Sequence, residues 1–388
     1  MKFLSTLLIS LVIIININAQ DISFAPPQIN PFGLADAGGS VRPVFVDIDN
    51  DGDLDCFDGL ENGQTAYFRN NGSPFIPSFG QWTNANLFGI IDVGLNSAPA
   101  FTDINNDNKD DAFVGEIAGD IYYFRNIGSL SSPSFAAQIV NPSGISRLGT
   151  YYSPAFVDID DDGDMDLFVG VLTGDILYFL NTGDVNNFQF ASGVTNPFNF
   201  SNAGSRAAIS FTDIDNDGDY DAFVGNSSGN ILGYENIGDK NFPLFNSPVP
   251  NPFGLTNVIQ SATPTFADID NDGRDDCFVG NTAGNIYYFR NTSVVSVESE
   301  QNSDIVELKA YPNPVSSVLN INAANNITTE HISVFNILGQ RINVNANTST
   351  NLISLDFSSL TNGIYLLVVT NDKLNFVTKV IKTGKAVR

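Results

Sequence analysis

Short stretches in which apolar and polar residues alternate recur along the chain up to residue 293, and they predict strands. Each pair of stretches flanks a turn rich in aspartate, and each such core is followed by a second aromatic stretch, as in GDIYYFRNIG from Gly119. A shorter piece and a loop containing Asn-Pro then precede the next core. Each repeat therefore predicts four short strands separated by Gly, Asn and Asp turns. The five cores are PVFVDIDNDGDLDCFDG from Pro43, PAFTDINNDNKDDAFVG from Pro99, PAFVDIDDDGDMDLFVG from Pro154, AISFTDIDNDGDYDAFVG from Ala208 and PTFADIDNDGRDDCFVG from Pro264.

The repeats have a regular period, because their first aspartates are spaced 56, 55, 55 and 55 residues apart. A period near 55 with four strands per repeat predicts the blades of a β-propeller, five of them over residues 20–293. A β-solenoid is the alternative, although solenoid coils are usually shorter. A strand-like ISFAPPQ from Ile22 precedes the first core, and nothing comparable follows Asn291. We therefore expect the N-terminal strand to complete the last blade and close the ring, which leaves no open sheet edge.

The pattern changes after Asn291. Residues 294–305 form a short polar linker, and residues 306–388 lose the acidic repeat. Alternating strands with Pro, Asn and Gly turns over about 80 residues, as in LTNGIYLLVV from Leu360, predict a small β-sandwich. The predicted fold class is therefore all-β: a propeller of five four-stranded blades followed by a small C-terminal β-sandwich.

The first 19 residues have the layout of a secretory signal peptide. Lys2 is followed by an apolar run over residues 3–15 and by a small-residue cleavage site that ends at Ala19. This run is too short for a membrane span; a buried core strand is the alternative. We expect residues 1–19 to be removed and the chain to be exported through the periplasm.

Composition and charge narrow the function classes. The chain of 388 residues has 43 Asp and Glu against 17 Lys and Arg, a formal charge of −26. That balance argues against nucleic acid or an anionic membrane surface as the main partner, because both need a basic footprint. A single His leaves little room for His-based acid–base, triad or zinc chemistry.

The aspartates of each core follow the spacing D-x-D/N-x-D-G/N-x-x-D. In the first loop, Asp47, Asp49, Asp51 and Asp55 stand at positions 1, 3, 5 and 9, with the carbonyl of Asp53 at position 7. Calcium is a hard cation that takes six to eight oxygen ligands, and alternating carboxylates around a tight turn supply them. We expect position 6 to need a positive φ, which suits the glycines there and also Asn108 in the second loop.

The same spacing predicts up to five Ca²⁺ sites, one per repeat. A metal-free solvated turn is the alternative; it is disfavoured because the five loops hold 25 of the 43 acids, which repel one another. An EF-hand is excluded, since position 12 is Val in four loops and Asp58 in the first, and strands flank each loop. The further predicted ligands are Asp103, Asn105, Asp107, the Lys109 carbonyl and Asp111; Asp158, Asp160, Asp162, the Asp164 carbonyl and Asp166; Asp213, Asp215, Asp217, the Asp219 carbonyl and Asp221; and Asp268, Asp270, Asp272, the Arg274 carbonyl and Asp276.

On these aspartates and the Phe-Val-Gly segments that follow them, residues 20–293 resemble the FG-GAP and VCBS repeats, the calcium-loop propellers related to the integrin α head. The resemblance implies binding and adhesion rather than one conserved reaction. The first repeat departs from the pattern, with Asp58 in place of valine. We therefore expect its second strand to be bent or more exposed.

Residues 306–388 resemble the type A C-terminal sorting domain of the type IX secretion system of Bacteroidota. The resemblance rests on Pro312-Asn313-Pro314, the Leu338-Gly339 turn, Gly363-x-Tyr365 and a basic tail. It implies recognition by the type IX machinery at the outer membrane. A fibronectin-like accessory sandwich is the alternative.

Two further sets of residues carry expectations. Cys56 and Cys277 occupy the same place in the first and last repeats. A disulfide across the ring closure is one alternative in an oxidising compartment. Two buried thiols are favoured, because equivalent positions on adjacent blades usually lie too far apart for a disulfide. We expect the matched arginines Arg69, Arg125 and Arg290 to pair with loop carboxylates.

The sequence thus favours a secreted or cell-surface calcium-binding propeller that binds a glycan or a protein partner and is not an enzyme. One alternative is an extracellular hydrolase of polysaccharide or peptide, for which two acids could serve glycoside hydrolysis. The other is a purely structural surface protein.

Overall fold

The computed structural model describes residues 22–184, 186–293, 309–322, 332–336, 341–349, 352–371 and 374–384. The chain divides into two compact units, Met1–Ser296 and Val297–Arg388. The predicted signal peptide, the linker and the Leu338-Gly339 turn lie outside the described residues. Among the residues that are described, no helix is both long and apolar enough to span a membrane.

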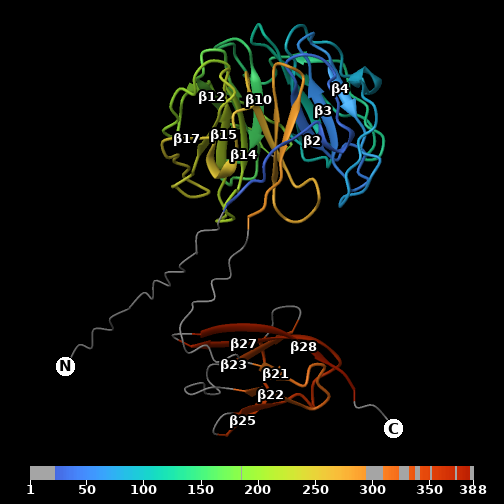
Figure 1. Ribbon diagram of the computed structural model, residues 1–388, viewed down its shortest axis with the longest axis vertical. Helices are drawn as coiled ribbons and strands as arrows, with labels where there is room; N and C mark the ends of the chain where they lie inside the picture. The colour runs from blue at the N-terminus through green and yellow to red at the C-terminus, as the bar shows by residue number, and fades with distance from the viewer. Residues whose placement is uncertain are drawn as a thin grey trace, which may run out of the picture. The chain divides into compact units, whose positions relative to one another are not determined.

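The first unit contains five four-stranded antiparallel sheets, as expected for a five-bladed propeller (Figure 1). Short 3-10 turns at η1 (Pro31–Gly33), η2 (Ala85–Phe88) and η3 (Pro252–Gly254) interrupt the loops between them. In Figure 1, β14, β15 and β17 follow one another from the middle of the first unit towards one side, and β2, β3 and β4 follow one another towards the other. The strands are β2 (Arg42–Val46), β3 (Asp55–Gly59), β4 (Thr65–Phe68) and β5 (Thr83–Asn84) in blade 1; β6 (Ala98–Thr102), β7 (Asp111–Gly115), β8 (Ile121–Phe124) and β9 (Ile139–Val140) in blade 2; β10 (Ser153–Val157), β11 (Asp166–Gly170), β12 (Ile176–Phe179) and β13 (Val194–Thr195) in blade 3; β14 (Ala208–Thr212), β15 (Asp221–Gly225), β16 (Ile231–Tyr234) and β17 (Val249–Pro250) in blade 4; and β18 (Thr263–Ala267), β19 (Asp276–Gly280) and β20 (Ile286–Phe289) in blade 5.

The N-terminal segment supplies the fourth strand of blade 5, which confirms the expected closure. Strand β1 (Gln28–Ile29) pairs antiparallel with Tyr287 and Tyr288 of β20, and an isolated bridge joins Phe24 to Asn291. The first and last segments of the ring therefore share one sheet, so that this edge of blade 5 is paired rather than open.

The glycine that ends the second strand of each blade lies against the backbone that leads into the next blade. A Cβ on Gly170 would lie 2.3 Å from the carbonyl oxygen of Ala207, which belongs to the next blade. Gly280 meets the Val41 carbonyl oxygen in the same way and joins blade 5 to blade 1. Only glycine leaves room for this backbone contact.

Aromatic pairs join neighbouring blades at the same level. A Phe on the first strand of each blade packs on a Phe of the second strand of the blade before it, with ring centroids 4.2–4.7 Å apart. Such tilted ring pairs add to the stabilisation that the buried area provides. The five pairs are Phe57–Phe101, Phe113–Phe156, Phe168–Phe211, Phe223–Phe266 and, across the closure, Phe45–Phe278.

Strand β3 of blade 1 is neither bent nor exposed, so the expectation drawn from Asp58 is wrong. All five residues of β3 are buried and pair in register with β2. Asp58 is fully buried, and its Oδ1 accepts the backbone N–H of Arg42 at 2.6 Å. That hydrogen bond lets a carboxyl take the place of valine in a regular strand, while burial raises the pKa of Asp58 to about 8.

Both cysteines are buried free thiols, as favoured from the sequence. Cys56 packs in a core cluster with Phe68 and Phe278, whereas Cys277 packs in another with Phe223 and Phe289. In both places the thiol acts as a small apolar side chain.

The described residues of the second unit form two four-stranded sheets around one core, ordered β21-β22-β26-β25 and β24-β23-β27-β28. Leu319 and Leu355 of the first sheet and Val334 and Leu367 of the second belong to the same buried cluster, so the two inner faces pack on each other as in a sandwich. The strands are β21 (Lys309–Tyr311), β22 (Val318–Asn322), β23 (Ile332–Asn336), β24 (Arg341–Ile342), β25 (Asn345–Ser349), β26 (Leu352–Asp356), β27 (Gly363–Asn371) and β28 (Leu374–Lys382).

Candidate metal centre

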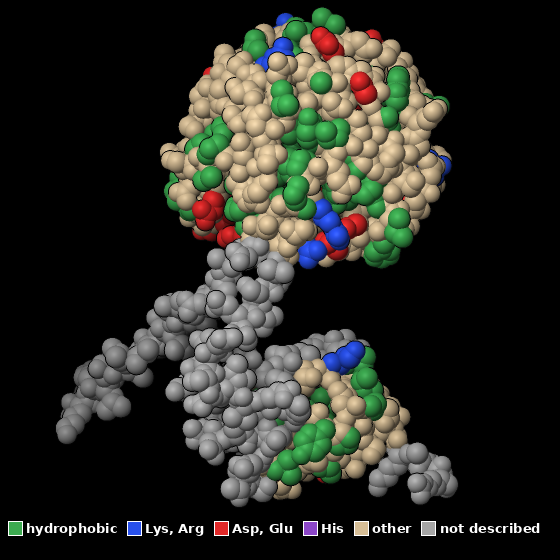
Figure 2. All heavy atoms as spheres, in the orientation of Figure 1, with side chains coloured by type: hydrophobic (Ala, Val, Ile, Leu, Met, Phe, Trp, Pro, Cys, Tyr) green, Lys and Arg blue, Asp and Glu red, His purple; other side chains and the backbone are tan. Residues whose placement is uncertain are grey.

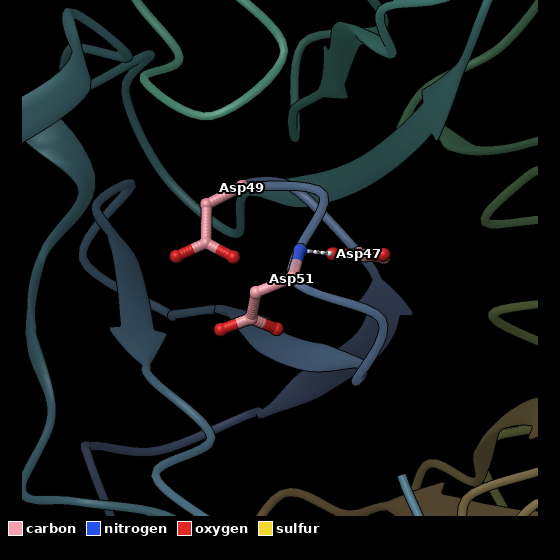
Figure 3. A group of neighbouring side chains, drawn as sticks. All are labelled: Asp47, Asp49 and Asp51. Carbon is pink, nitrogen blue, oxygen red and sulfur yellow. Dashed lines mark hydrogen bonds between the residues drawn. The ribbon is translucent and has the colours of Figure 1, made fainter. Parts of the chain in front are cut away.

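Each acidic loop joins the first and second strands of a blade and is folded around its position-1 aspartate. In blade 1, the two carboxylate oxygens of Asp47 accept the backbone N–H groups of Asp51 at 3.1 Å and Gly52 at 3.0 Å. Figure 3 shows this turn, with the carboxylates of Asp49 and Asp51 next to each other. The position-1 residues Asp103, Asp158, Asp213 and Asp268 accept the same two backbone N–H groups in their own loops.

The turn needs two residues with positive φ. Position 6 is one of them, as expected, with φ of 94° at Gly52 and 60° at Asn108. Position 4 is the other and was not foreseen; Asn50, for example, has φ of 54°. An Asn or Asp at position 4 of every loop was the available signal, because these residues tolerate the left-handed region.

Positions 1, 3 and 5 converge on one point. Carboxylate oxygens of Asp47, Asp49 and Asp51 lie within 4.8 Å of one another, and the corresponding aspartates of loops 3, 4 and 5 do the same. In loop 2, Asn105 replaces the second aspartate, and its Nδ2 donates to Asp111 Oδ2 at 2.7 Å. Positions 3 and 9 are therefore neighbours in that loop. The other converging sets are Asp158, Asp160 and Asp162; Asp213, Asp215 and Asp217; and Asp268, Asp270 and Asp272.

The position-3 side chains carry oxygens that have no hydrogen-bond partner although they are buried. These atoms are the Oδ1 of Asp49, Asn105, Asp160 and Asp270. A buried oxygen without a partner costs roughly 1–3 kcal/mol, and its recurrence at position 3 of four loops fits a cation as its partner. A cation at the centre of each loop would satisfy these oxygens.

The side chain at position 7 divides the loops into two classes. Burial, followed by the charges of neighbouring aspartates, raises the pKa of Asp53, Asp164 and Asp219 to about 6. In loops 2 and 5 the position holds a base instead: Lys109 pairs with Asp107 at 3.3 Å, and Arg274 pairs with Asp272. These bases lower the net negative charge around the two loops.

Position 9 fastens each loop to the third strand of its blade. Asp55 is buried; its Oδ1 accepts the backbone N–H of Asn70 at 2.7 Å and its Oδ2 accepts the Tyr67 hydroxyl at 2.9 Å. Burial raises the pKa of Asp55 to about 7. The loop spacing predicts Asp55 as a ligand but does not reveal these two bonds, although a Tyr three residues before an Asn recurs in four repeats. The same pair of bonds forms at Asp111, Asp166 and Asp276.

The three matched arginines pair with loop carboxylates, as expected. Arg69 lies 2.9 Å from Asp49 and 3.5 Å from Asp51; Arg290 makes the equivalent pairs in blade 5, and Arg125 lies 3.5 Å from Asp107. Because these guanidinium groups are about half exposed, each pair contributes little to stability. Figure 2 shows that acidic side chains gather in small groups on the face of the first unit drawn there.

Two family models match the chain. The FG-GAP-like repeat matches residues 103–169, 158–224 and 213–279, and the secretion system C-terminal sorting domain matches residues 309–383. The chain therefore carries FG-GAP-like repeats in a propeller, followed by a type IX sorting domain. That domain indicates export with secretion or attachment to the cell surface, and it implies recognition by the type IX machinery.

Solved structures with a similar fold share little sequence with the chain. A chain of the Photorhabdus luminescens Tc holotoxin pore is 13% identical over 70% of this chain, with a TM-score of 0.38; this chain spans 15% of its length. A lectin of Agrocybe aegerita, solved for its recognition of non-reducing terminal N-acetylglucosamine, is 18% identical over 74% of this chain and 75% of its own, with a TM-score of 0.36. The Dos1 propeller is 11% identical over 61% of this chain and 65% of its own, with a TM-score of 0.29. No curated protein matches the chain.

Proposed function

We propose that the protein is an exported binding module whose five-bladed ring is stabilised by calcium and which binds a glycan or a protein partner, without catalysing a reaction. The observation that carries the calcium site is the buried position-3 oxygen without a partner, which recurs in four loops and lies beside three converging carboxylates in loops 1, 3 and 5. The FG-GAP-like repeat supports the binding role.

The donor set favours calcium among common cations. Every side-chain donor at positions 1, 3, 5 and 9 is an oxygen, which suits a hard cation, whereas zinc prefers nitrogen and sulfur. Magnesium demands a tight octahedron and releases its waters reluctantly. A nine-residue loop with several carboxylates fits the larger and more adaptable shell of calcium.

The placement of the acids supports binding over catalysis. The loop aspartates are held by backbone N–H groups, as Asp47 is by Asp51 and Gly52, in an arrangement that surrounds a cation rather than a scissile bond. A hydrolase would need an acid pair that flanks its substrate. The triplets instead have all three carboxylates directed to one point.

Removing calcium tests the metal assignment. Each site that forms only in the folded state stabilises it by about 2.7 kcal/mol at a hundredfold excess over Kd. We expect EDTA to lower the melting temperature by many degrees, calcium to restore it, and magnesium to restore less. In Asp160→Asn the response should shrink, whereas the control Glu61→Gln, outside the loops, should respond as the natural chain does. An unchanged melt, with no calcium found by elemental analysis, would refute the assignment.

Binding is tested separately. A glycan array and a pull-down, each run in calcium and in EDTA, should reveal a ligand whose binding is lost with the metal. Release of reducing sugars from polysaccharides by the purified chain would favour the hydrolase instead. A chain that binds nothing in either assay would match a structural surface protein.

A further inference from the structure

One blade lacks a side chain that the other four share. In blades 1, 2, 3 and 5, the third strand carries a tyrosine whose hydroxyl donates to the Oδ2 of the position-9 aspartate at 2.8–2.9 Å. Gly233 of β16 takes this place in blade 4, where it pairs with Phe223 of β15. The four tyrosines are Tyr67, Tyr123, Tyr178 and Tyr288.

The aromatic surroundings of the missing tyrosine are nevertheless present. Tyr178 lies between Phe168 and Phe198, with ring centroids 4.7 and 5.0 Å from its own. Tyr67 and Tyr288 each lie between two phenylalanines in the same manner. By position in the repeat, the blade 4 counterparts of Phe168 and Phe198 are Phe223 and Phe253.

A cavity of about 420 Å³ opens where the tyrosine would lie. Gly233 lines it, together with Phe223, Phe253, Pro252 and the position-9 aspartate Asp221. This volume lies within the range of small-molecule sites. The cavity is larger than one aromatic ring, so it also has room for the part of a ligand to which the ring is attached.

The polar end of the cavity matches the phenol sites of the other blades. Asp221 is 4% exposed, and its Oδ1 accepts the Asn236 N–H at 2.8 Å, as in every blade. Its Oδ2 accepts the Ile214 N–H at 3.3 Å, which is long, instead of a hydroxyl at 2.8–2.9 Å. Asp215 and Glu235 also line the cavity, so a neutral or cationic carrier is favoured over an anionic one.

We propose that this cavity binds a phenol group, as on a tyrosine side chain or a small phenolic compound. The ring lies between Phe223 and Phe253, and the hydroxyl donates to Asp221 Oδ2. In the other four blades, a tyrosine of the chain itself fills the equivalent place, which the ligand fills in blade 4. This inference rests on the proposed binding function and deepens it by naming a ligand class. Asp215 and Asp221 are also predicted calcium ligands of loop 4, so each titration is run both in calcium and in EDTA.

The ligand enters without the steric conflict that a side chain at position 233 would meet. A Cβ on Gly233 would lie 2.7 Å from Pro252 Cγ, so Gly233→Tyr requires Pro252 to shift. Blades 3 and 5 combine tyrosine with a proline at the equivalent loop position, Pro197 and Pro31. The shift is therefore compatible with the blade, and Gly233→Tyr is a reasonable variant to fill the cavity.

Titration of the purified chain with p-cresol by calorimetry tests the site, with toluene as the probe that lacks the hydroxyl. We expect p-cresol to bind about tenfold or more tightly than toluene, because a hydrogen bond to a buried carboxylate is stronger than a neutral one. Gly233→Tyr should abolish binding and Phe253→Ala should weaken it. Val194→Ala, at the exposed strand of blade 3, should leave it unchanged. Equal affinity for p-cresol and toluene, or full affinity in Gly233→Tyr, would overturn the proposal.

A second titration distinguishes the sources of the phenol. If the natural ligand is a tyrosine side chain, a short peptide with a central tyrosine should bind and its phenylalanine analogue should not. If the natural ligand is a small phenol, p-cresol should bind and the tyrosine peptide should not. Absence of both overturns the site. The calcium-dependent melt of the same samples reports on the metal, so a failed phenol site leaves the calcium proposal standing, and a failed calcium site leaves the phenol result readable. If Gly233→Tyr does not fold, Phe253→Ala still decides the outcome.

Discussion

The position-9 aspartate of each loop does two kinds of work at once. It ends an acidic loop, where its carboxylate would be a ligand of a bound cation. It also accepts hydrogen bonds from a backbone N–H that follows the third strand and, in four blades, from a tyrosine hydroxyl on that strand. Asp55, Asp111, Asp166, Asp221 and Asp276 are all buried. Because burial disfavours the charged form, the metal-free ring should be sensitive to pH.

We predict that the calcium-free protein is more stable at pH 5 than at pH 8. Burial raises the pKa of Asp55, Asp166 and Asp276 to about 7, whereas an unfolded aspartate has a pKa of about 3.9. Between these values the folded state binds more protons, so the free energy of unfolding falls as the pH rises. Thermal melts in EDTA at the two pH values measure this.

Calcium should reverse this fall in stability with rising pH. A bound cation favours the carboxylate form of the loop aspartates, and protonation of these aspartates releases the cation. The melt in saturating calcium should therefore be at least as high at pH 8 as at pH 5. A calcium-free melt that is higher at pH 8 would contradict the role of the buried aspartates.

Position 7 predicts how the loops rank in affinity. Loops 1, 3 and 4 carry an aspartate there, whereas loops 2 and 5 carry Lys109 and Arg274, which pair with the position-5 carboxylates. A base that close competes with a cation. Calcium titration should show a tight class of sites and a weak class, and Lys109→Asp should add one site to the tight class. Lys379→Asp, in the second unit, is the control and should change nothing; the same count of tight sites in both variants would argue against the ranking.

At the scale of the elements, each blade depends on strands that are distant in sequence. The Phe pairs join the first strand of each blade to the second strand of the blade before it, and the Gly that ends each second strand touches the backbone that leads into the next blade. Strand β1 adds the last piece, since it completes blade 5 from the other end of the chain. The ring is therefore held by contacts between blades as well as by pairing within them.

We predict that Gly170→Ala destabilises the propeller by about 1–3 kcal/mol, the usual cost of overpacking. A Cβ there would lie 2.3 Å from the carbonyl oxygen of Ala207, and neither strand can move without disturbing its own sheet. Urea denaturation measures the change. Gly363→Ala is the control, because the nearest atom to its Cβ is 4.0 Å away. Equal stability of the two variants would show that the blades can move apart at little cost.

At the scale of the whole molecule, the two units have separate sheets and separate cores. The first contains the acidic loops and the second matches the sorting domain. Each unit therefore meets the physical conditions for folding by itself.

We predict that deleting residues 306–388 leaves a folded, calcium-responsive propeller that stays in the periplasm. Circular dichroism and the calcium-dependent melt of the truncated chain report folding, and its distribution between periplasm, cell surface and medium reports export. Normal arrival of the truncated chain outside the cell would refute the role of the second unit in secretion. An unfolded truncated chain would instead show that the propeller depends on the second unit.

The repeated pattern was enough to predict the five blades, the closing N-terminal strand and the acidic loops. Strand periodicity and turn residues act between near neighbours, and five copies of one pattern reinforce each other. The expectation for Asp58 was wrong because a change from valine to aspartate suggests exposure. The carboxyl is instead buried: its Oδ1 accepts the Arg42 N–H of the adjacent strand, and its Oδ2 has no hydrogen-bond partner. The Tyr67–Asp55 bond was missed because the spacing of the loop alone does not show which side chains of the next strand reach it.

By itself, the sequence determined what is local: the strands, the turns, the order of the blades and the loop positions that can hold a cation. Only the tertiary structure decided which groups meet across the ring. It placed unpaired oxygens at position 3, buried the position-9 carboxylates against tyrosines, and left a cavity where Gly233 replaces one of them. The physical reason is that burial and packing depend on segments far apart in the chain. The absence of one side chain leaves a cavity only where the residues around it are packed in place by the rest of the fold.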